Sequence, residues 1–178
     1  HCPMSNKKMN ELYTVNYLGN VVGGDIIKYA NVGINELKNA AIKSLKKNEA
    51  VWFGCDVGKW LNYSKGVMDL DIFDYENLFD ITFGMNKATR LEYGESVMTH
   101  AMLFTGVDII NDKPKKWRVE NSWGDKGGDK GYYLMTDKWF DQYNYEVVVD
   151  KKYLPKDILS IFKRTPQQLP PWDPMGSL

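Results

Sequence analysis

The chain of 178 residues has 23 basic and 23 acidic side chains, so its formal net charge is zero. This balance gives no global attraction to nucleic acid or to an anionic membrane, although assembly could gather lysines on one face. No apolar run approaches the ~18 residues of a membrane-spanning helix, and residues 1–6 lack the pattern of a signal peptide. One hydrophobic core is expected for a chain of this length.

The N-terminus and the cysteines give two further expectations. Residue 1 is not a methionine, which is typical of an internal piece of a longer chain. Cys2 and Cys55 are too few for a disulfide framework. A reducing, cytoplasmic location is therefore the default expectation.

The first third of the chain predicts a strand and then a helix. β-branched and aromatic residues over 12–18 indicate the strand, and Gly23 and Gly24 end or turn it. Apolar residues at three- and four-residue spacing predict a helix over about 35–47. Asn35 is its expected cap, and lysines in its last turn oppose the negative end of the helix dipole.

A continuous apolar run over 50–58 predicts a central strand that is buried on both faces. Cys55 lies in this run beside Asp56, whose negative charge disfavours a thiolate. We therefore interpret Cys55 as a buried small hydrophobic residue and not as a nucleophile. The acidic residues over 69–76 do not follow the ligand spacing of a calcium loop. The sequence thus predicts no metal or cofactor.

Two apolar, β-rich runs over 100–107 and 117–124 flank a polar stretch at 111–116 and predict a hairpin. Folding it between residues 110 and 111 predicts these facing pairs: Phe104 with Trp117, Met102 with Val119, and His100 with Asn121. Because opposed residues place their Cβ atoms roughly 5 Å apart, the Asn121 oxygen could reach an imidazole N–H of His100. Such a pair is the base and orienter of a Cys-His-Asn site. The alternative is a structural histidine in a hairpin core.

The residues that follow favour the catalytic interpretation. Asn121-Ser122-Trp123-Gly124, with Gly128 and Gly131-Tyr132, resembles the signature around the catalytic asparagine of the papain superfamily. Gly127 departs from that signature, since many papain-like enzymes carry a bulky residue there, and this changes a packing contact and not the chemistry. The acidic residues of the segment would repel a phosphate, so its glycines indicate tight turns and not a nucleotide-binding loop.

The last part predicts a strand over 131–135, a short helix over 137–143 and a closing strand over 145–149. The tail over 165–178 has four prolines and is expected to be extended. A disordered terminus is one interpretation of it. Its apolar residues Trp172, Met175 and Leu178 instead suit an arm that is laid along a groove.

The chain as a whole resembles the C-terminal part of the bleomycin hydrolases, a family of cytoplasmic papain-like cysteine aminopeptidases. The most specific stretches are residues 49–58, 94–96, 98–102, 117–124, 145–150 and 171–176. The resemblance implies that His100 is the catalytic base, that Asn121 orients it and that Trp123 covers their hydrogen bond. It also implies a homo-hexamer with active sites in an internal cavity.

The resemblance further implies that the tail occupies part of the active-site cleft and that its terminal carboxylate faces the free amino end of a peptide substrate. The arm residues concerned are Met175, Gly176, Ser177 and Leu178. We divide the chain into residues 1–162, a β-rich portion of a peptidase domain, and residues 163–178, the arm.

The papain-type nucleophile motif, Gln-x-Gly-x-Cys, does not occur in the sequence. The resemblance places the nucleophile in an N-terminal part of the enzyme, so this chain alone is expected to be inactive. The expected fold is α+β, the C-terminal part of a papain-like fold with an antiparallel, barrel-like sheet and helices. The alternative function is that of an inactive scaffold or a nucleic-acid-binding homologue.

Overall fold

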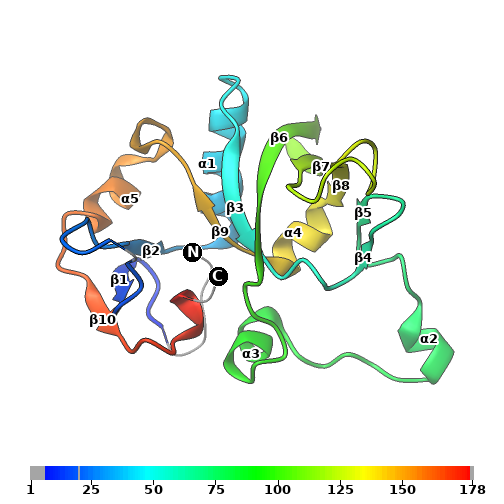
Figure 1. Ribbon diagram of the computed structural model, residues 1–178, viewed down its shortest axis with the longest axis horizontal. Helices are drawn as coiled ribbons and strands as arrows, with labels where there is room; N and C mark the ends of the chain where they lie inside the picture. The colour runs from blue at the N-terminus through cyan, green and yellow to red at the C-terminus, as the bar shows by residue number, and fades with distance from the viewer. Residues whose placement is uncertain (1–6, 20, 177–178) are drawn as a thin grey trace.

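Two β-sheets organise the computed structural model, which describes residues 7–19 and 21–176 (Figure 1). The larger sheet has seven strands in the order β4-β5-β8-β7-β6-β3-β9, and the smaller has three in the order β10-β1-β2. The strands are β1 (Glu11–Val15), β2 (Tyr29–Asn31), β3 (Val51–Cys55), β4 (Leu61–Asn62), β5 (Val67–Met68), β6 (His100–Ile110), β7 (Lys113–Glu120), β8 (Tyr132–Thr136), β9 (Asn144–Val148) and β10 (Gln167–Leu169).

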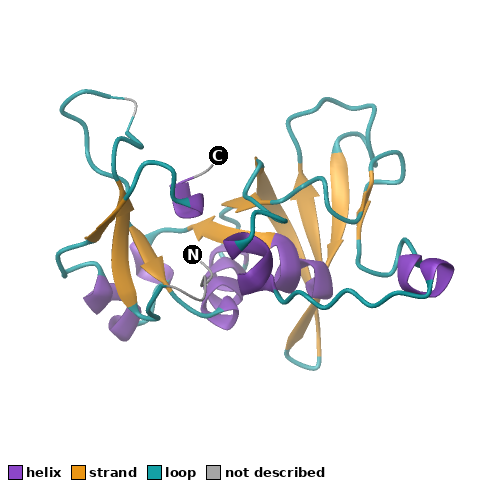
Figure 2. Ribbon diagram, turned by 90° about the horizontal axis from the view of Figure 1, so that it is seen from below, coloured by secondary structure: helices purple, strands orange, loops and turns teal. Residues whose placement is uncertain are grey.

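Short helices complete the predicted α+β fold, which is confirmed. The helices are α1 (Ile34–Leu45), α2 (Tyr75–Phe79), α3 (Lys87–Glu92), α4 (Asp137–Tyr143) and α5 (Lys156–Ile161), with 3-10 turns η1 (Lys151–Tyr153) and η2 (Pro174–Gly176). The small sheet lies at one end of the molecule and α2 at the other (Figures 1 and 2). Within the described residues, no helix is long and apolar enough to cross a membrane.

The predicted hairpin is formed by β6 and β7, but its predicted register is wrong by two to three residues. Phe104 faces Val119, and Val107 faces Trp117. The turn is the two-residue pair Asn111 and Asp112, with φ of 51° and 59°. Positive φ at both central residues is the type I′ geometry that matches the twist of the flanking strands. The polar stretch predicted as the turn therefore belongs mostly to β7.

The register error leaves the inward face unchanged, because a shift of two residues preserves the alternation of side chains along a strand. Met102, Phe104, Trp117 and Val119 all lie in the main core, as expected for one face. The Phe104 ring stacks on Phe53 of β3, with centroids 3.8 Å apart. The hairpin is thereby fixed against the central strand β3, whose pairing partners are β6 and β9.

The helices α1 and α4 pack against the same core. Leu37 and Ala41 of α1 and Trp139 of α4 are buried in it. Lys38 of α1 joins the two helices, since its ammonium group lies 2.7 Å from an oxygen of Asp137 and forms a second ion pair with α4. The predicted cap of α1 is wrong: Gly33 occupies the N-cap position, and it supplies no side-chain hydrogen bond.

Two strand pairs depart from the predicted antiparallel arrangement. β5 runs parallel to β8, and β10 runs parallel to β1. The second pair joins the tail to the first strand of the chain. Met175, in η2, is fully buried with Tyr13 and Val15 in a separate small core. The tail is therefore built into the small sheet as far as residue 176.

Candidate active site

His100 and Asn121 meet at the end of the β6–β7 hairpin. His100 is the first residue of β6, and Asn121 directly follows β7. The His100 Nε2 atom lies 2.8 Å from the Asn121 Oδ1 atom. In the observed register the two residues are diagonal neighbours and not directly opposed, but side chains of this length still reach one another across a diagonal. The predicted pair is thus brought together despite the register error.

The hydrogen bond defines which imidazole nitrogen can act as a base. The amide oxygen can only accept, so Nε2 must be the nitrogen that donates. In the neutral imidazole, Nδ1 then carries the lone pair. No hydrogen bond within residues 7–19 and 21–176 uses that nitrogen. Oδ1 also accepts a hydrogen bond from the Ser122 backbone N–H, at 2.8 Å, which helps to hold the amide.

Trp123 lies over the imidazole. Its ring stacks on His100 with centroids 4.7 Å apart and an interplanar angle of 29°. The Tyr63 ring packs in turn against the Trp123 ring, with centroids 6.0 Å apart. Whether Trp123 shields the His100–Asn121 hydrogen bond from water stays a prediction, since Trp123 is 42% exposed. This is the position that the sequence resemblance predicts for Trp123.

The glycine-rich segment after Asn121 brings β8 back beside β7. The Asn121 backbone N–H donates to the Gly131 carbonyl at 3.1 Å. Gly131 has φ of +86°, and a Cβ atom there would lie 2.8 Å from the Gly124 oxygen. Glycine is required at this position for both reasons. The segment therefore forms tight turns, as predicted, and fixes the backbone of Asn121.

Cys55 does not supply a nucleophile. It lies directly opposite His100 in the pairing of β3 with β6, but its side chain is fully buried in the main core. Burial raises the pKa of the Cys55 thiol well above its usual value, and the neighbouring Asp56 adds to the effect. A thiol in this environment is unreactive, which agrees with the interpretation from the sequence.

A buried polar network beside His100 escaped the sequence analysis. The Ser96 hydroxyl donates to Asp56 Oδ2 at 2.7 Å and forms a second hydrogen bond with the Tyr145 hydroxyl, at 2.5 Å. All three side chains are buried. Asp56 follows β3 and Ser96 precedes β6, so the network ties together the two chain segments next to His100. The sequence feature that could have pointed to this network is the stretch 94–96, which carries part of the family resemblance.

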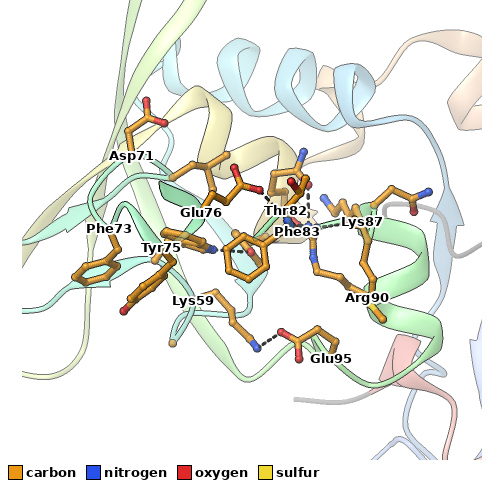
Figure 3. Close-up of a pocket in the computed structure, with 18 of the residues that line it drawn as sticks. Lys59, Asp71, Phe73, Tyr75, Glu76, Thr82, Phe83, Lys87, Arg90 and Glu95 are labelled. Carbon is orange, nitrogen blue, oxygen red and sulfur yellow. Dashed lines mark hydrogen bonds and ion pairs between the residues drawn. The ribbon is translucent and has the colours of Figure 1, made fainter. Parts of the chain in front are cut away.

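A groove of about 1690 Å³ does not contain His100 or Asn121. Phe73, Tyr75 and Phe83 gather on one wall, and the ion pair between Lys59 and Glu95 lies below them (Figure 3). The groove is formed by the segment between β3 and β6 together with Gln142 and Tyr143 of α4. It holds no pair of a nucleophile and a base, so the candidate site remains at the hairpin.

Part of the arm, within the described residues, lies beside α3. Trp172 and Asp173 line a hollow of about 550 Å³ together with Glu92 of α3. Met175 is fully buried, and a Cβ atom on Gly176 would lie 3.0 Å from the Val15 side chain. The predicted arm residues Ser177 and Leu178 lie outside the described part of the chain.

Comparisons with known proteins agree with the geometry. The model of the Peptidase C1-like family matches residues 1–176. The chain is 48% identical over 179 residues to the aminopeptidase C of Lactobacillus delbrueckii subsp. lactis, and 51% identical over 180 residues to the bleomycin hydrolase of Homo sapiens. Each of these alignments covers 99% of this chain and 40% of the relative.

A solved structure is similar over the same span. The crystal structure of PepW from Lactobacillus rhamnosis aligns with a TM-score of 0.96 at 51% identity, and the alignment covers 99% of this chain and 40% of that one. The chain therefore spans about 40% of the length of the relatives that it matches.

Proposed function

The chain belongs to the Peptidase C1-like family, and from this premise we propose that it supplies the base and the orienting amide of a cysteine aminopeptidase. The observation that carries the proposal is the 2.8 Å contact between His100 Nε2 and Asn121 Oδ1. It leaves Nδ1 as the basic nitrogen, under the cover of Trp123. The nucleophilic cysteine is proposed to lie in the part of the relatives that this chain does not span.

The proposed reaction is covalent acyl transfer. A cysteine thiol next to Nδ1 would transfer its proton to His100, because a thiolate–imidazolium pair can bring a cysteine pKa to about 3–4. The thiolate would attack the first peptide carbonyl, and the imidazolium would protonate the leaving amine. A water molecule activated by His100 would then hydrolyse the acyl-enzyme.

Asn121 keeps the ring and its tautomer fixed through this cycle. An amide carries no charge, so it orients the imidazole without the large increase in pKa that a carboxylate would cause.

The selectivity for a free N-terminus is proposed to come from the arm. A chain terminus near the cleft would block one side of it, and its carboxylate would attract the α-ammonium group of a peptide. In support, the arm is held up to residue 176 by the buried Met175 and by pairing with β1. We also propose that the complete enzyme assembles as a homo-hexamer.

The experiment uses the complete enzyme and substrates with a free or an acetylated N-terminus. His100→Ala is expected to lower kcat by about a thousandfold or more, because removing one member of a catalytic triad has an effect of this size. Cys55→Ala is the matched control, and it should retain both activity and inactivation by a thiol reagent. A His100→Ala enzyme with normal turnover, or equal cleavage of acetylated peptides, would contradict the proposal.

A further inference from the structure

One end of the Asn121 side-chain amide, the Nδ2 group, is not accounted for by the hydrogen bonds described above. Oδ1 accepts hydrogen bonds from His100 and from the Ser122 backbone. Nδ2 is buried and makes no hydrogen bond of normal length and angle within the described residues. A buried donor that stays unpaired costs free energy, so a partner is expected close by.

The hydroxyl of Tyr133 is the complementary group. It is also buried and also makes no hydrogen bond of normal geometry within the part of the chain that the structure describes. Tyr133 faces Val119 across the β7–β8 pairing, and the Asn121 N–H donates to Gly131. Tyr133 is therefore a diagonal neighbour of Asn121 on the same face of the sheet, within reach of a long aromatic side chain.

Gly127 shows where this hydroxyl lies. A Cβ atom on Gly127 would lie 2.2 Å from the Tyr133 oxygen and 2.8 Å from the Tyr63 ring. The two tyrosines thus fill the space beside Gly127. Burial and the nearby Tyr63 raise the pKa of Tyr133, whereas the Asn121 side chain lowers it. The lowering is the effect expected of an amide donor that faces a phenol oxygen.

We propose that Tyr133 is a positioning residue, whose phenol oxygen accepts the Nδ2 hydrogen and holds the Asn121 amide with Oδ1 turned toward His100. The inference rests on the proposed function and adds a third member to the site. Orientation matters because the two ends of an amide are nearly equal in size. With Nδ2 turned to the ring, two donors would oppose each other and the imidazolium would be disfavoured.

The test compares Tyr133→Phe with Tyr63→Phe in the complete enzyme. Both changes remove one hydroxyl from the same aromatic cluster, in which the two ring centroids lie 6.3 Å apart. Turnover is expressed per active-site thiol, titrated with a thiol-directed inhibitor, so that unfolded protein is not counted. We expect Tyr133→Phe to lower kcat about fivefold to tenfold, the effect of one hydrogen bond, with KM unchanged. Tyr63→Phe should leave both constants unchanged.

The same substitution in an Asn121→Ala background separates positioning from a general structural effect. If Tyr133 acts through Asn121, Tyr133→Phe lowers kcat no further in that background, whereas independent effects would multiply. Equal kcat in Tyr133→Phe and the parent, or an undiminished effect without the amide, would overturn the inference. The proposed function has its own control in the same assay, because retained activity of His100→Ala would contradict it whatever the effect of Tyr133→Phe.

Discussion

Glu146 is a carboxyl group that the fold buries at the edge of the large sheet. It lies on β9 opposite Gly54 and is 5% exposed. No ion pair or hydrogen bond to its side chain is formed within the described residues. Burial raises the pKa of Glu146 to about 7. The group is therefore a titratable site close to neutral pH that the proposed reaction does not use.

This shift predicts a pH dependence of stability. A glutamate in the unfolded chain has a pKa near 4.3, so between about pH 4 and 7 the folded state binds more protons than the unfolded state. The stabilising effect is complete below the unfolded pKa and is lost as the pH rises through 7. We expect Glu146→Gln to raise the free energy of unfolding at pH 8 by about 3 kcal/mol relative to its effect at pH 4.

Urea unfolding of both proteins at pH 4 and pH 8 measures the difference. Glu120→Gln is the matched control, since Glu120 is exposed on β7, and it should not change the pH dependence. An equal effect of Glu146→Gln at the two pH values would show that the pKa of Glu146 is not raised in the folded state.

At this scale the sequence predicted the groups that carry a motif but not those that depend on packing. His100 and Asn121 followed from strand alternation and from the signature after Asn121. The network of Asp56, Ser96 and Tyr145 joins three segments that are distant in sequence. No local pattern encodes such a contact. The role of Gly127 likewise became clear only with the positions of Tyr63 and Tyr133.

At the scale of elements, the hairpin shows how an incorrect turn can leave a site correct. Pro114 suggested that the polar stretch was a loop, but it lies in β7 next to an irregularity in the pairing. The true turn uses Asn111 and Asp112, both of which tolerate positive φ better than most residues. At the end of the hairpin near Phe104 and Val119, the predicted register was wrong by an even number of residues, which keeps each side chain on its predicted face. The core face and the meeting of His100 with Asn121 were therefore predicted correctly.

The turn itself can be tested at Asp112, which has φ of 59°. A β-branched side chain is strained in this conformation, so Asp112→Val should lower the free energy of unfolding by about 1–2 kcal/mol. Asp108→Val makes the same change at an exposed strand position of β6 and should be neutral or slightly stabilising. Thermal or urea unfolding compares the two. A loss no larger at Asp112 than at Asp108 would contradict the type I′ turn.

Other elements depended on contacts that a local pattern cannot show. The parallel pairing of β5 with β8 joins residues almost seventy positions apart, for example Val67 with Leu134. The predicted cap Asn35 lies inside α1, because the helix begins one residue earlier and Gly33 occupies the N-cap position. Element type was therefore predicted more reliably than pairing or boundaries.

At the scale of the whole molecule, the two ends of the described chain are held together. β10 pairs with β1, and the Lys7 ammonium lies 2.9 Å from Asp173 Oδ2. The side chains of this ion pair are only 3% and 10% exposed. Asp173 Oδ1 also accepts the Met175 backbone N–H at 2.9 Å. The apolar composition of the tail suggested an arm in a groove, but its ionic anchor was not predicted from the sequence.

Not every apolar residue of the tail contributes to this anchoring. Met175 is fully buried, whereas Trp172 is 82% exposed. Met175 is thus docked, but it lies in the 3-10 turn η2 and not in extended backbone. The placement of the arm in the active-site cleft stays a prediction.

The anchor predicts that one charge controls the release of the arm. Asp173→Asn keeps an oxygen for the Met175 N–H but removes the charge that Lys7 pairs with. Since loss of one partner of a buried ion pair costs about 3–5 kcal/mol, we expect a loss of stability in this range. Replacing both partners, in Lys7→Met with Asp173→Asn, should cost much less, because no buried charge remains and the oxygen for the Met175 N–H is kept. The exposed pair of Lys138 and Asp71 provides the control, and Asp71→Asn should cost no more than about 1 kcal/mol.

Limited trypsin digestion measures release of the arm directly, because Lys163 and Arg164 precede β10. Cleavage there should be faster in Asp173→Asn than in the parent or in Asp71→Asn, and slow again in the double variant. In the complete enzyme, the proposed function adds that arm release permits cleavage of acetylated peptides, since the terminus that blocks the cleft is displaced. Cleavage of Asp173→Asn at the rate of the parent would show that the charge pair does not hold the arm.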